Sequence, residues 1–482
     1  MNQQKSVMSG IGTMAALTIS SKLVRLLILM ITARFLTPED FGVVAAFTMV
    51  FAFAYLLSEM GIVRTIIQRP EINIKHIGSA LVLSVFLSLI VASSLILFND
   101  YISKILTIDD ISLPLGISSM MFLLLGVSNV CSALLQRDGE VVFIGKVQAF
   151  GTIFGNVFVT IPLLYFDIGY WAIIIGLWAS ELISVVFILC KNFKKLHFKV
   201  YRKEAIEIAQ YSSAFFLNNT LTLLSQQIDV AIVSRFMGSV ALGNYSRAMQ
   251  LVEFPNQVYW LVVDRVVFPV MSTMKSEKEK LTLFFLESIS LLSLGLTIGT
   301  VVLIFGSHEI VSLMMGEQWG VVGDILQVLA ACIIFRALTA FMDSFLAAYG
   351  LVKILTIKQI FSLFLLVISI WSALDYGVIG IAYSVVIASA LRFFLTLLLI
   401  VLNTYVKTSL LIKAFIPSLF SSLIIIFIYF LLSQLPIFIG LFGVIVAVIF
   451  LLSTYILFPM KVLMSESGVN FLSIIKKRYF KS

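Results

Sequence analysis

Charged side chains recur inside stretches of this chain that are otherwise apolar, and they are the residues whose types could do chemistry. An ionisable group within a membrane-spanning helix costs about 2.5–3.5 kcal/mol on insertion scales, so it normally faces a bundle interior or a wet cavity. Arginine matches phosphate oxygens bidentately, and lysine adds a point charge. We therefore expect an anionic head group, such as a phosphate or pyrophosphate, to meet five cations: Lys22, Arg25, Arg64, Arg247 and Arg336.

Polar and acidic side chains accompany these cations. Residues 211–236 carry a polar stripe at three-to-four spacing, which places it on one helix face, and the following span continues it. The predicted substrate site therefore adds the amides Asn218, Gln226 and Gln250. We expect a coupling proton or sodium ion, if one drives the process, to bind among four carboxylates: Glu59, Asp229, Glu253 and Asp343.

Structural roles for the same residues stay open at this point. Arg64, Arg265 and Arg392 lie close enough to span ends to extend toward the membrane surface. An alternative role for Lys22 with Glu59, and for Arg336 with Asp343, is a structural ion pair between helices. The polar stripe would equally serve interhelical hydrogen bonding.

The composition excludes a soluble protein. The chain is 60% hydrophobic and only 12% charged, with a mean hydropathy of +1.09, and runs of about 20 apolar residues recur along it. Cys131, Cys190 and Cys332 lie in apolar spans without disulfide or metal spacing, and the three histidines do not form a catalytic or metal-binding constellation. We therefore expect no metal, no cofactor and no enzymatic activity.

The apolar runs predict an all-α polytopic membrane protein with 14 spans, namely 12–35, 38–66, 78–98, 114–135, 146–166, 171–190, 211–236, 241–269, 282–305, 324–348, 354–374, 379–402, 412–433 and 438–459. The predicted organisation is an N-terminal lobe (1–190), a basic linker (191–210), a C-terminal lobe (211–403), two further spans (404–460) and a basic tail (461–482).

An internal repeat relates the two predicted lobes. The run RFLTPEDFG at 34–42 pairs without a gap with RFMGSVALG at 235–243, so Gly42 matches Gly243 and, further on, Arg64 matches Arg265. Thr37, Pro38 and Asp40 predict a capped helix start in the first copy. Turns at DIG 167–169 and DYG 375–377, and glycines at 139 and 350, occupy corresponding junctions. Two six-helix lobes of parallel orientation follow.

The distribution of basic residues predicts the orientation. Lysine and arginine concentrate in alternate short loops, including 191–203, and in both termini, whereas the opposite loops are acidic. Both termini are therefore expected on the cytoplasmic side. The net charge of +8 is explained by basic loops that face an anionic leaflet, and no nucleic-acid partner is expected.

The runs RFLTPEDFG at 34–42, EMG at 59–61, IIQR at 66–69 and GNYSRA at 243–248 resemble the polysaccharide transporter family. This family includes the Wzx-type flippases and belongs to the multidrug/oligosaccharidyl-lipid/polysaccharide exporter superfamily. The resemblance implies two six-helix lobes plus two helices, alternating access, and a cargo of undecaprenyl-pyrophosphate-linked oligosaccharide for surface polysaccharide synthesis. It also implies a location in the bacterial inner membrane and a proton or sodium gradient as the driving force. A polysaccharide polymerase or export complex is an expected partner.

Two other classes of function remain open for this sequence. A cation-coupled multidrug exporter of the same superfamily would favour acids and aromatics over basic groups in its cavity. A membrane-embedded polymerase or ligase would need a large outward loop or a catalytic constellation, and the predicted outward loops are short.

Overall fold

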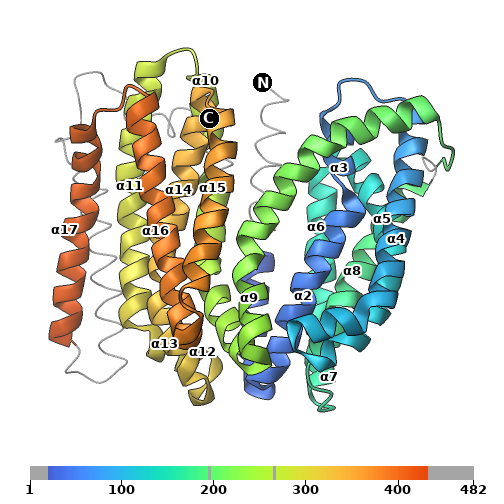
Figure 1. Ribbon diagram of the computed structural model, residues 1–482, viewed down its shortest axis with the longest axis horizontal. Coiled ribbons are helices and arrows are strands. Elements are labelled where there is room, and N and C mark those ends of the chain that lie inside the picture. Colours follow the sequence, from blue (N-terminus) through green and yellow to red (C-terminus); the bar gives the residue numbers. More distant parts are fainter. Residues whose placement is uncertain (1–19, 194–196, 264–266, 433–482) are drawn as a thin grey trace. The chain divides into compact units, whose positions relative to one another are not determined.

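The computed structural model describes residues 20–193, 197–263 and 267–432 (Figure 1). Throughout these residues the regular secondary structure is helical, which confirms the all-α class. Within the described part of the chain, ten helices are long and apolar enough to cross a membrane. Most of the predicted span 412–433 is present in α17 (Thr408–Leu432), whereas the span 438–459, the basic tail and Arg265 lie outside the described residues.

By its contacts the chain divides into two compact units, unit 1 (Met1–Arg247) and unit 2 (Ala248–Ser482). The helix α9 (Arg202–Val262) passes from one unit into the other. It begins inside the predicted linker and includes the predicted span 211–236 and residues 241–262 of the predicted span 241–269. The two parts are separated at Gly238, where φ is 79° and ψ is −175°. The division falls after Arg247 because the first part of α9 packs against helices of unit 1.

Unit 1 begins with a helix over residues 20–35. The further elements are α2 (Pro38–Glu59), α3 (Ile62–Gln68), α4 (Ile74–Leu106), η1 (Asp109–Ile111), α5 (Ser112–Arg137), α6 (Val141–Ile153), η2 (Phe154–Thr160), α7 (Ile161–Leu164) and α8 (Trp171–Asn192), with α9 as far as Arg247.

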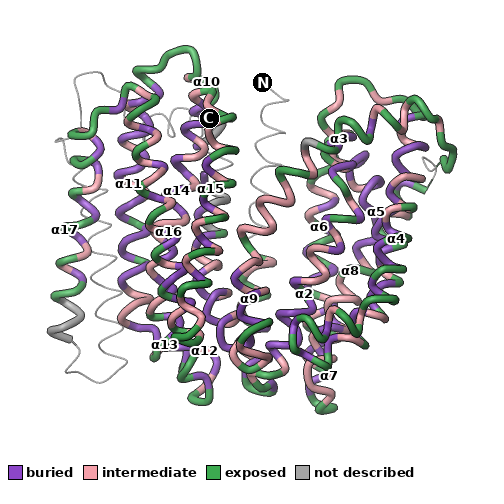
Figure 2. The backbone as a smooth tube through the Cα atoms, in the orientation of Figure 1, coloured by how far each residue is buried: buried purple, intermediate pink, exposed green. Residues whose placement is uncertain are grey.

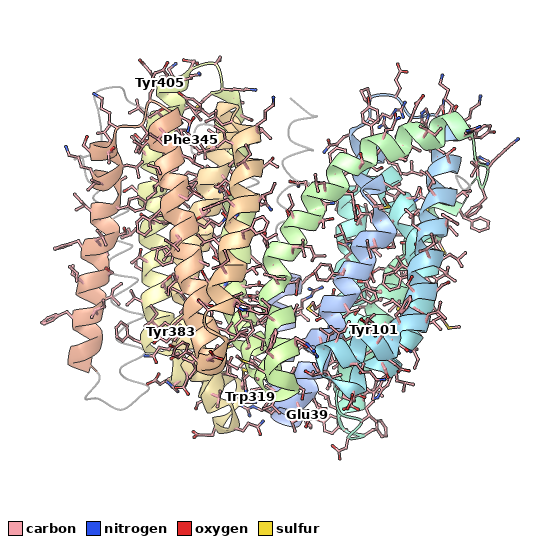
Figure 3. The ribbon with its side chains drawn as sticks, in the orientation of Figure 1. Glu39, Tyr101, Trp319, Phe345, Tyr383 and Tyr405 are labelled. Carbon is pink, nitrogen blue, oxygen red and sulfur yellow. The ribbon has the colours of Figure 1, made fainter. Side chains whose placement is uncertain are left out.

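Unit 2 contains the remainder of α9 and the helices that follow it. These are α10 (Phe268–Thr273), α11 (Lys278–Phe305), α12 (Ser307–Met315), η5 (Glu317–Trp319), α13 (Gly320–Leu329), α14 (Ala331–Tyr349), α15 (Val352–Trp371), η6 (Leu374–Tyr376), α16 (Gly377–Asn403) and α17. Its core is aromatic: the ring of Phe285 stacks on those of Phe341 and Phe345 at centroid distances of 5.5 and 4.1 Å. Phe345, labelled in Figure 3, lies on α14.

The predicted helix start at Thr37 is confirmed. The Thr37 side chain accepts a hydrogen bond from the backbone N–H of Asp40, and the Asp40 carboxylate accepts one from the backbone N–H of Thr37 at 3.0 Å. The predicted turn glycines also adopt positive φ, 60° at Gly169 and 69° at Gly377. The capping box and these turns fix where the helices begin and end.

The predicted single span 38–66 is wrong in one respect, because the chain breaks it into α2 and α3. Met60 and Gly61 adopt left-handed conformations with φ of 43° and 79°. A Cβ atom on Gly61 would lie 2.6 Å from the backbone oxygen of Ser212 in α9. The break therefore lets the start of α9 approach the backbone closely, and only glycine fits there.

The repeated arginine–phenylalanine turns pack against each other inside unit 1. A Cβ atom on Gly42 would lie 2.0 Å from the backbone oxygen of Ser239, and one on Gly243 would lie 1.7 Å from that of Pro38. The predicted register pairs Pro38 with Ser239 and Gly42 with Gly243. Gly42 approaches Ser239, and Gly243 approaches Pro38, so the two contacts are equivalent under the repeat. Such reciprocity is typical of a two-fold relation, and small residues are what allow membrane helices this proximity.

Large apolar side chains cover the outer faces of the helices in each unit. Figure 2 shows exposed residues along α4 and α17, and among them are Phe86, Leu97, Leu419 and Phe427, each more than half exposed. Apolar exposure on this scale is characteristic of helices that face lipid.

Candidate functional site: a cavity in unit 1

A cavity of about 550 Å³ lies in unit 1 between α2, α3, α5, α8 and the first part of α9. Aromatic and aliphatic side chains form most of its wall, and charged or polar side chains interrupt them. The residues that line it are Phe47, Thr48, Phe51, Ala52, Tyr55, Leu56, Glu59, Arg64, Met121, Leu177, Trp178, Glu181, Asn219, Thr222, Leu223 and Gln226. A mostly apolar wall with a few convergent polar groups is typical of small-molecule sites.

Two carboxylates of the cavity each have an arginine nearby. Arg64 lies within electrostatic range of Glu59, and Arg25, on the helix 20–35, lies within electrostatic range of Glu181. Both carboxylates also act on the hydroxyl of Tyr55, so they belong to one electrostatic cluster. A guanidinium has five N–H donors, and a single carboxylate leaves some of them for a ligand.

Two aromatic residues of the wall are held from outside the cavity. The indole Nε1–H of Trp178 donates to the hydroxyl of Ser118 at 2.9 Å, and the hydroxyl of Tyr55 donates to Oδ1 of Asn129 at 2.8 Å. Because their polar atoms are engaged, these residues offer mainly their rings to whatever occupies the cavity. Aromatic side chains that are fixed in this way present a preorganised surface.

The structure brings four of the sequence-predicted residues together. Glu59, Arg64 and Gln226 line the cavity. Arg25 is not part of the cavity wall, but it interacts electrostatically with Glu181, which is. Asn218 is exposed and its neighbour Asn219 lines the cavity instead. Lys22 lies half-buried on the same helix as Arg25.

Two predicted residues of unit 1 are placed in packing contacts outside the cavity wall. The guanidinium of Arg247 lies over the ring of Phe41, with its carbon 4.4 Å from the ring centroid. Asp229 is buried and accepts a hydrogen bond from the hydroxyl of Tyr245 at 2.7 Å. The first contact joins α9 to α2, next to Gly42, and the second joins two parts of α9 on either side of Gly238. Both contacts therefore stabilise the local fold.

Four predicted residues belong to unit 2. Gln250, Glu253 and Arg336 are half-buried, and Arg336 directs a guanidinium nitrogen toward the sulfur of Met249 at 3.6 Å. Asp343 on α14 forms ion pairs with Lys358 of α15 and with Arg392 of α16, the latter at 3.7 Å. Lys358 also donates to the hydroxyl of Thr396 at 3.2 Å. This network holds three helices of unit 2 together.

Sequence reasoning missed Glu181 and Lys358. Glu181 is an acid in the middle of the apolar span 171–190, so the rule that identified the other charged residues would have found it. Lys358 lies inside the predicted span 354–374 but is not among the predicted site residues, and its side chain is only 1% exposed in α15. Within the described residues, no cluster of three or more histidine, cysteine or acidic side chains could hold a metal ion.

Comparison with known proteins agrees with this architecture. The structure of the lipid II flippase MurJ in an inward closed conformation matches with a TM-score of 0.76 at 16% identity, and the match covers 92% of this chain and 98% of that one. An inward-facing multidrug resistance MATE family transporter matches with a TM-score of 0.61 at 14% identity, over 80% of this chain and 97% of that one. At these identities the likeness shows the fold alone.

Relatives in sequence point to surface polysaccharides. The lipopolysaccharide biosynthesis protein WzxC of Escherichia coli is 23% identical over 70% of this chain and 69% of its own length. The teichuronic acid biosynthesis protein TuaB of Bacillus subtilis is 26% identical over 71% of each chain. A family model described as "Polysaccharide biosynthesis protein" matches residues 31–324. This chain therefore belongs to the polysaccharide biosynthesis protein family.

Proposed function

We propose that the protein is a flippase that moves undecaprenyl-pyrophosphate-linked oligosaccharides from the cytoplasmic to the periplasmic leaflet of the bacterial inner membrane. The lipid tail stays in the bilayer while the sugar head group crosses through the protein by alternating access. The relatives named for lipopolysaccharide and teichuronic acid biosynthesis support this cargo class. The proposed architecture is 14 spans in two six-helix lobes plus two helices, with both termini cytoplasmic.

One observation carries the proposal: unit 1 has a cavity lined in part by charged and amide side chains, among helices whose outer faces suit lipid. Charges at membrane depth are retained where they face a polar path. In this proposal Arg25 and Arg64 use their remaining N–H donors for the pyrophosphate, and Lys22 adds charge from the same helix as Arg25. Arg247 is proposed to stabilise the packing of α9 in unit 1, and Arg336 the helices of unit 2, rather than to bind phosphate.

The proposed driving force is a proton or sodium gradient. Of the four carboxylates predicted for ion coupling, Glu59 lines the cavity, so it is our first candidate. Asp229 and Asp343 are engaged with Tyr245 and with Lys358, respectively, and Glu253 is half-buried in unit 2. These three are secondary candidates. A polysaccharide polymerase remains the proposed partner, and the protein itself is proposed not to be an enzyme.

A specific observation favours a second candidate function. A multidrug exporter would favour acids and aromatics, and the cavity contains Glu59 and Glu181 beside Phe51, Tyr55 and Trp178. The fold of the MATE transporter is compatible with either cargo. The two functions differ in substrate, which makes them separable by transport.

Reconstituted vesicles loaded with an undecaprenyl-pyrophosphate oligosaccharide test the proposal. We expect protein-dependent appearance of the sugar on the opposite leaflet, and we expect Arg25→Ala and Arg64→Ala each to reduce its rate by at least about tenfold, because each removes a charge-assisted contact. Arg34→Ala, at an exposed end of the helix 20–35, is the matched control. Protein that exports cationic drugs but moves no lipid-linked oligosaccharide would overturn the proposal in favour of the exporter.

A further inference from the structure

A buried charge network in unit 2, formed by Asp343, Lys358 and Arg392, has no part in the proposed substrate site. Given the proposed function, on which this inference rests, we propose that Lys358 is a proton-exchanging site that couples transport to a proton gradient, in addition to the candidate Glu59 in unit 1. The features that point to this role are the burial of the ammonium, the charge balance of the network and the unpaired polar atoms near it.

The first step concerns burial. Lys358 lies about two helical turns inside α15, where a lysine could extend toward the membrane surface. Its side chain is instead only 1% exposed. The ammonium contacts the carboxylate of Asp343 on α14 and donates to the hydroxyl of Thr396 on α16 at 3.2 Å. An ionisable group that is held inside a membrane protein in this way is costly, which makes it a functional candidate.

The second step concerns charge. Among the described residues, α15 packs against α14 and α16 (Figure 1). The charged groups that these helices bring to the network are Asp343 and Arg392, whose guanidinium lies 3.7 Å from the same carboxylate. With Lys358 protonated, two cations share one carboxylate, and the formal charge is +1. Arginine stays protonated in proteins, whereas a buried lysine can release its proton. Release of one proton from Lys358 therefore makes the network neutral.

The third step concerns hydrogen bonds. An ammonium has three N–H donors, so two remain when it loses a proton. Lys358 has two acceptors, Asp343 and Thr396, and the neutral amine can therefore keep both bonds. The bond to Asp343 loses its charge assistance, which roughly doubles the strength of such a bond, and the carboxylate is left to Arg392. Protonation of Lys358 thus changes how firmly α15 is held to its neighbours.

The fourth step concerns a path for the proton. Thr339 lies one turn from Asp343 on α14, and Ser362 lies one turn from Lys358 on α15, so each shares a helix face with the network. Both side chains are buried, and their hydroxyls have no hydrogen-bond partner among the described residues. The same holds for the buried Nε of Arg392. Ordered water commonly satisfies such atoms. In the proposed step an N–H bond of Lys358 breaks, its electron pair stays on nitrogen, and a water oxygen takes the proton.

The test measures transport of an undecaprenyl-pyrophosphate oligosaccharide in reconstituted vesicles, with and without a pH gradient that is acidic on the side receiving the sugar. We expect the gradient to raise the wild-type rate at least about fivefold. Lys358→Arg keeps the charge but cannot release the proton, and Lys358→Met has neither, so both should bring this ratio to about one. Lys353→Met, at an exposed position of the same helix, is the matched control and should keep the wild-type ratio.

The ratio is taken within each variant, so it does not depend on how much protein is folded. A purely structural ion pair would survive Lys358→Arg with its ratio intact, and that result would overturn the assignment to Lys358. A pH-sensitive dye inside the vesicles adds a measurement on the wild type alone, and we expect proton movement to accompany sugar transport. Transport that a sodium gradient drives without a dye signal would overturn the inference and leave the proposed function intact. Failure to move the oligosaccharide under either gradient would instead count against the proposed function.

Discussion

The contact between Gly42 and Gly243 gives the sharpest prediction about the fold. Each glycine lies where a Cβ atom would collide with the backbone of the other helix: 2.0 Å from the Ser239 oxygen for Gly42 and 1.7 Å from the Pro38 oxygen for Gly243. Ordinary contacts of a Cβ atom lie at 3.4–4 Å. Because the obstructing atoms are backbone, alanine at either position forces the helices apart rather than displacing a side chain.

The magnitude follows from this geometry. Overpacking in a close-packed interior typically costs about 1–3 kcal/mol, and here the required movement of roughly 1.5 Å or more involves two helices. Alanine favours a helix over glycine by about 1 kcal/mol, which offsets part of the cost. We therefore expect Gly42→Ala and Gly243→Ala each to destabilise the protein by up to about 2 kcal/mol.

The assay is thermal denaturation of the purified protein in detergent, followed by intrinsic fluorescence. Gly320→Ala is the matched control, since Gly320 begins α13 in helical conformation and no atom of the described residues lies within 4 Å of its added Cβ. The control should melt at or slightly above the wild-type temperature. Wild-type melting of both Gly42→Ala and Gly243→Ala would refute the close approach, and with it the reciprocal contact of the two repeated segments.

Two further predictions concern ion pairs. In unit 2, Asp343→Asn should lower the free energy of unfolding by about 3–5 kcal/mol, because it leaves the buried Lys358 without its carboxylate. Adding Lys358→Met should restore most of that loss in a thermal denaturation assay. A double variant as unstable as Asp343→Asn would contradict this account. In unit 1, hydrogen bonds from Arg69 and then His76 hold the pKa of Glu207 below its usual range. The stability from this contact is therefore present above the pKa of a free glutamate, about 4.3, and is lost as the pH falls through the lowered value. The melting temperature of wild type should exceed that of Glu207→Gln at pH 7, and the difference should shrink steadily as the pH falls below the pKa of a free glutamate. A difference that does not change with pH would contradict this account.

Local signals in the sequence predicted local structure well. The capping box at Thr37 and the positive φ at Gly169 and Gly377 depend on a few adjacent residues, so their types suffice to identify them. The all-helical class follows from the length of the apolar runs. The break at Gly61 was not predicted, because it depends on the approach of Ser212 from a distant part of the chain.

The candidate site was predicted only in part, for a similar reason. A polar stripe shows that one helix face is turned inward, but it does not say whether that face meets a cavity or packed side chains. Glu59 and Gln226 line the cavity, whereas Asp229, on the same stripe as Gln226, meets Tyr245. The rotation of α9 about its own axis determines whether Asn218 or Asn219 faces the cavity, and tertiary packing sets that rotation.

Glu181 lies outside the spans 12–35, 38–66, 211–236 and 241–269, which hold most of the predicted site residues. Its role depends on the proximity of α8 to α2, which no pattern within the span 171–190 reveals.

The central claim is that the cavity of unit 1 receives the sugar head group of a lipid-linked oligosaccharide. Photocrosslinking tests it most directly, with a photoreactive side chain placed at Thr222 in the cavity wall or at Phe361 on the exposed face of α15. With a radiolabelled undecaprenyl-pyrophosphate oligosaccharide in vesicles, the account predicts a labelled adduct at the sugar from position 222 and none at the sugar from position 361. Sugar adducts from position 361 alone, with position 222 unlabelled, would contradict it.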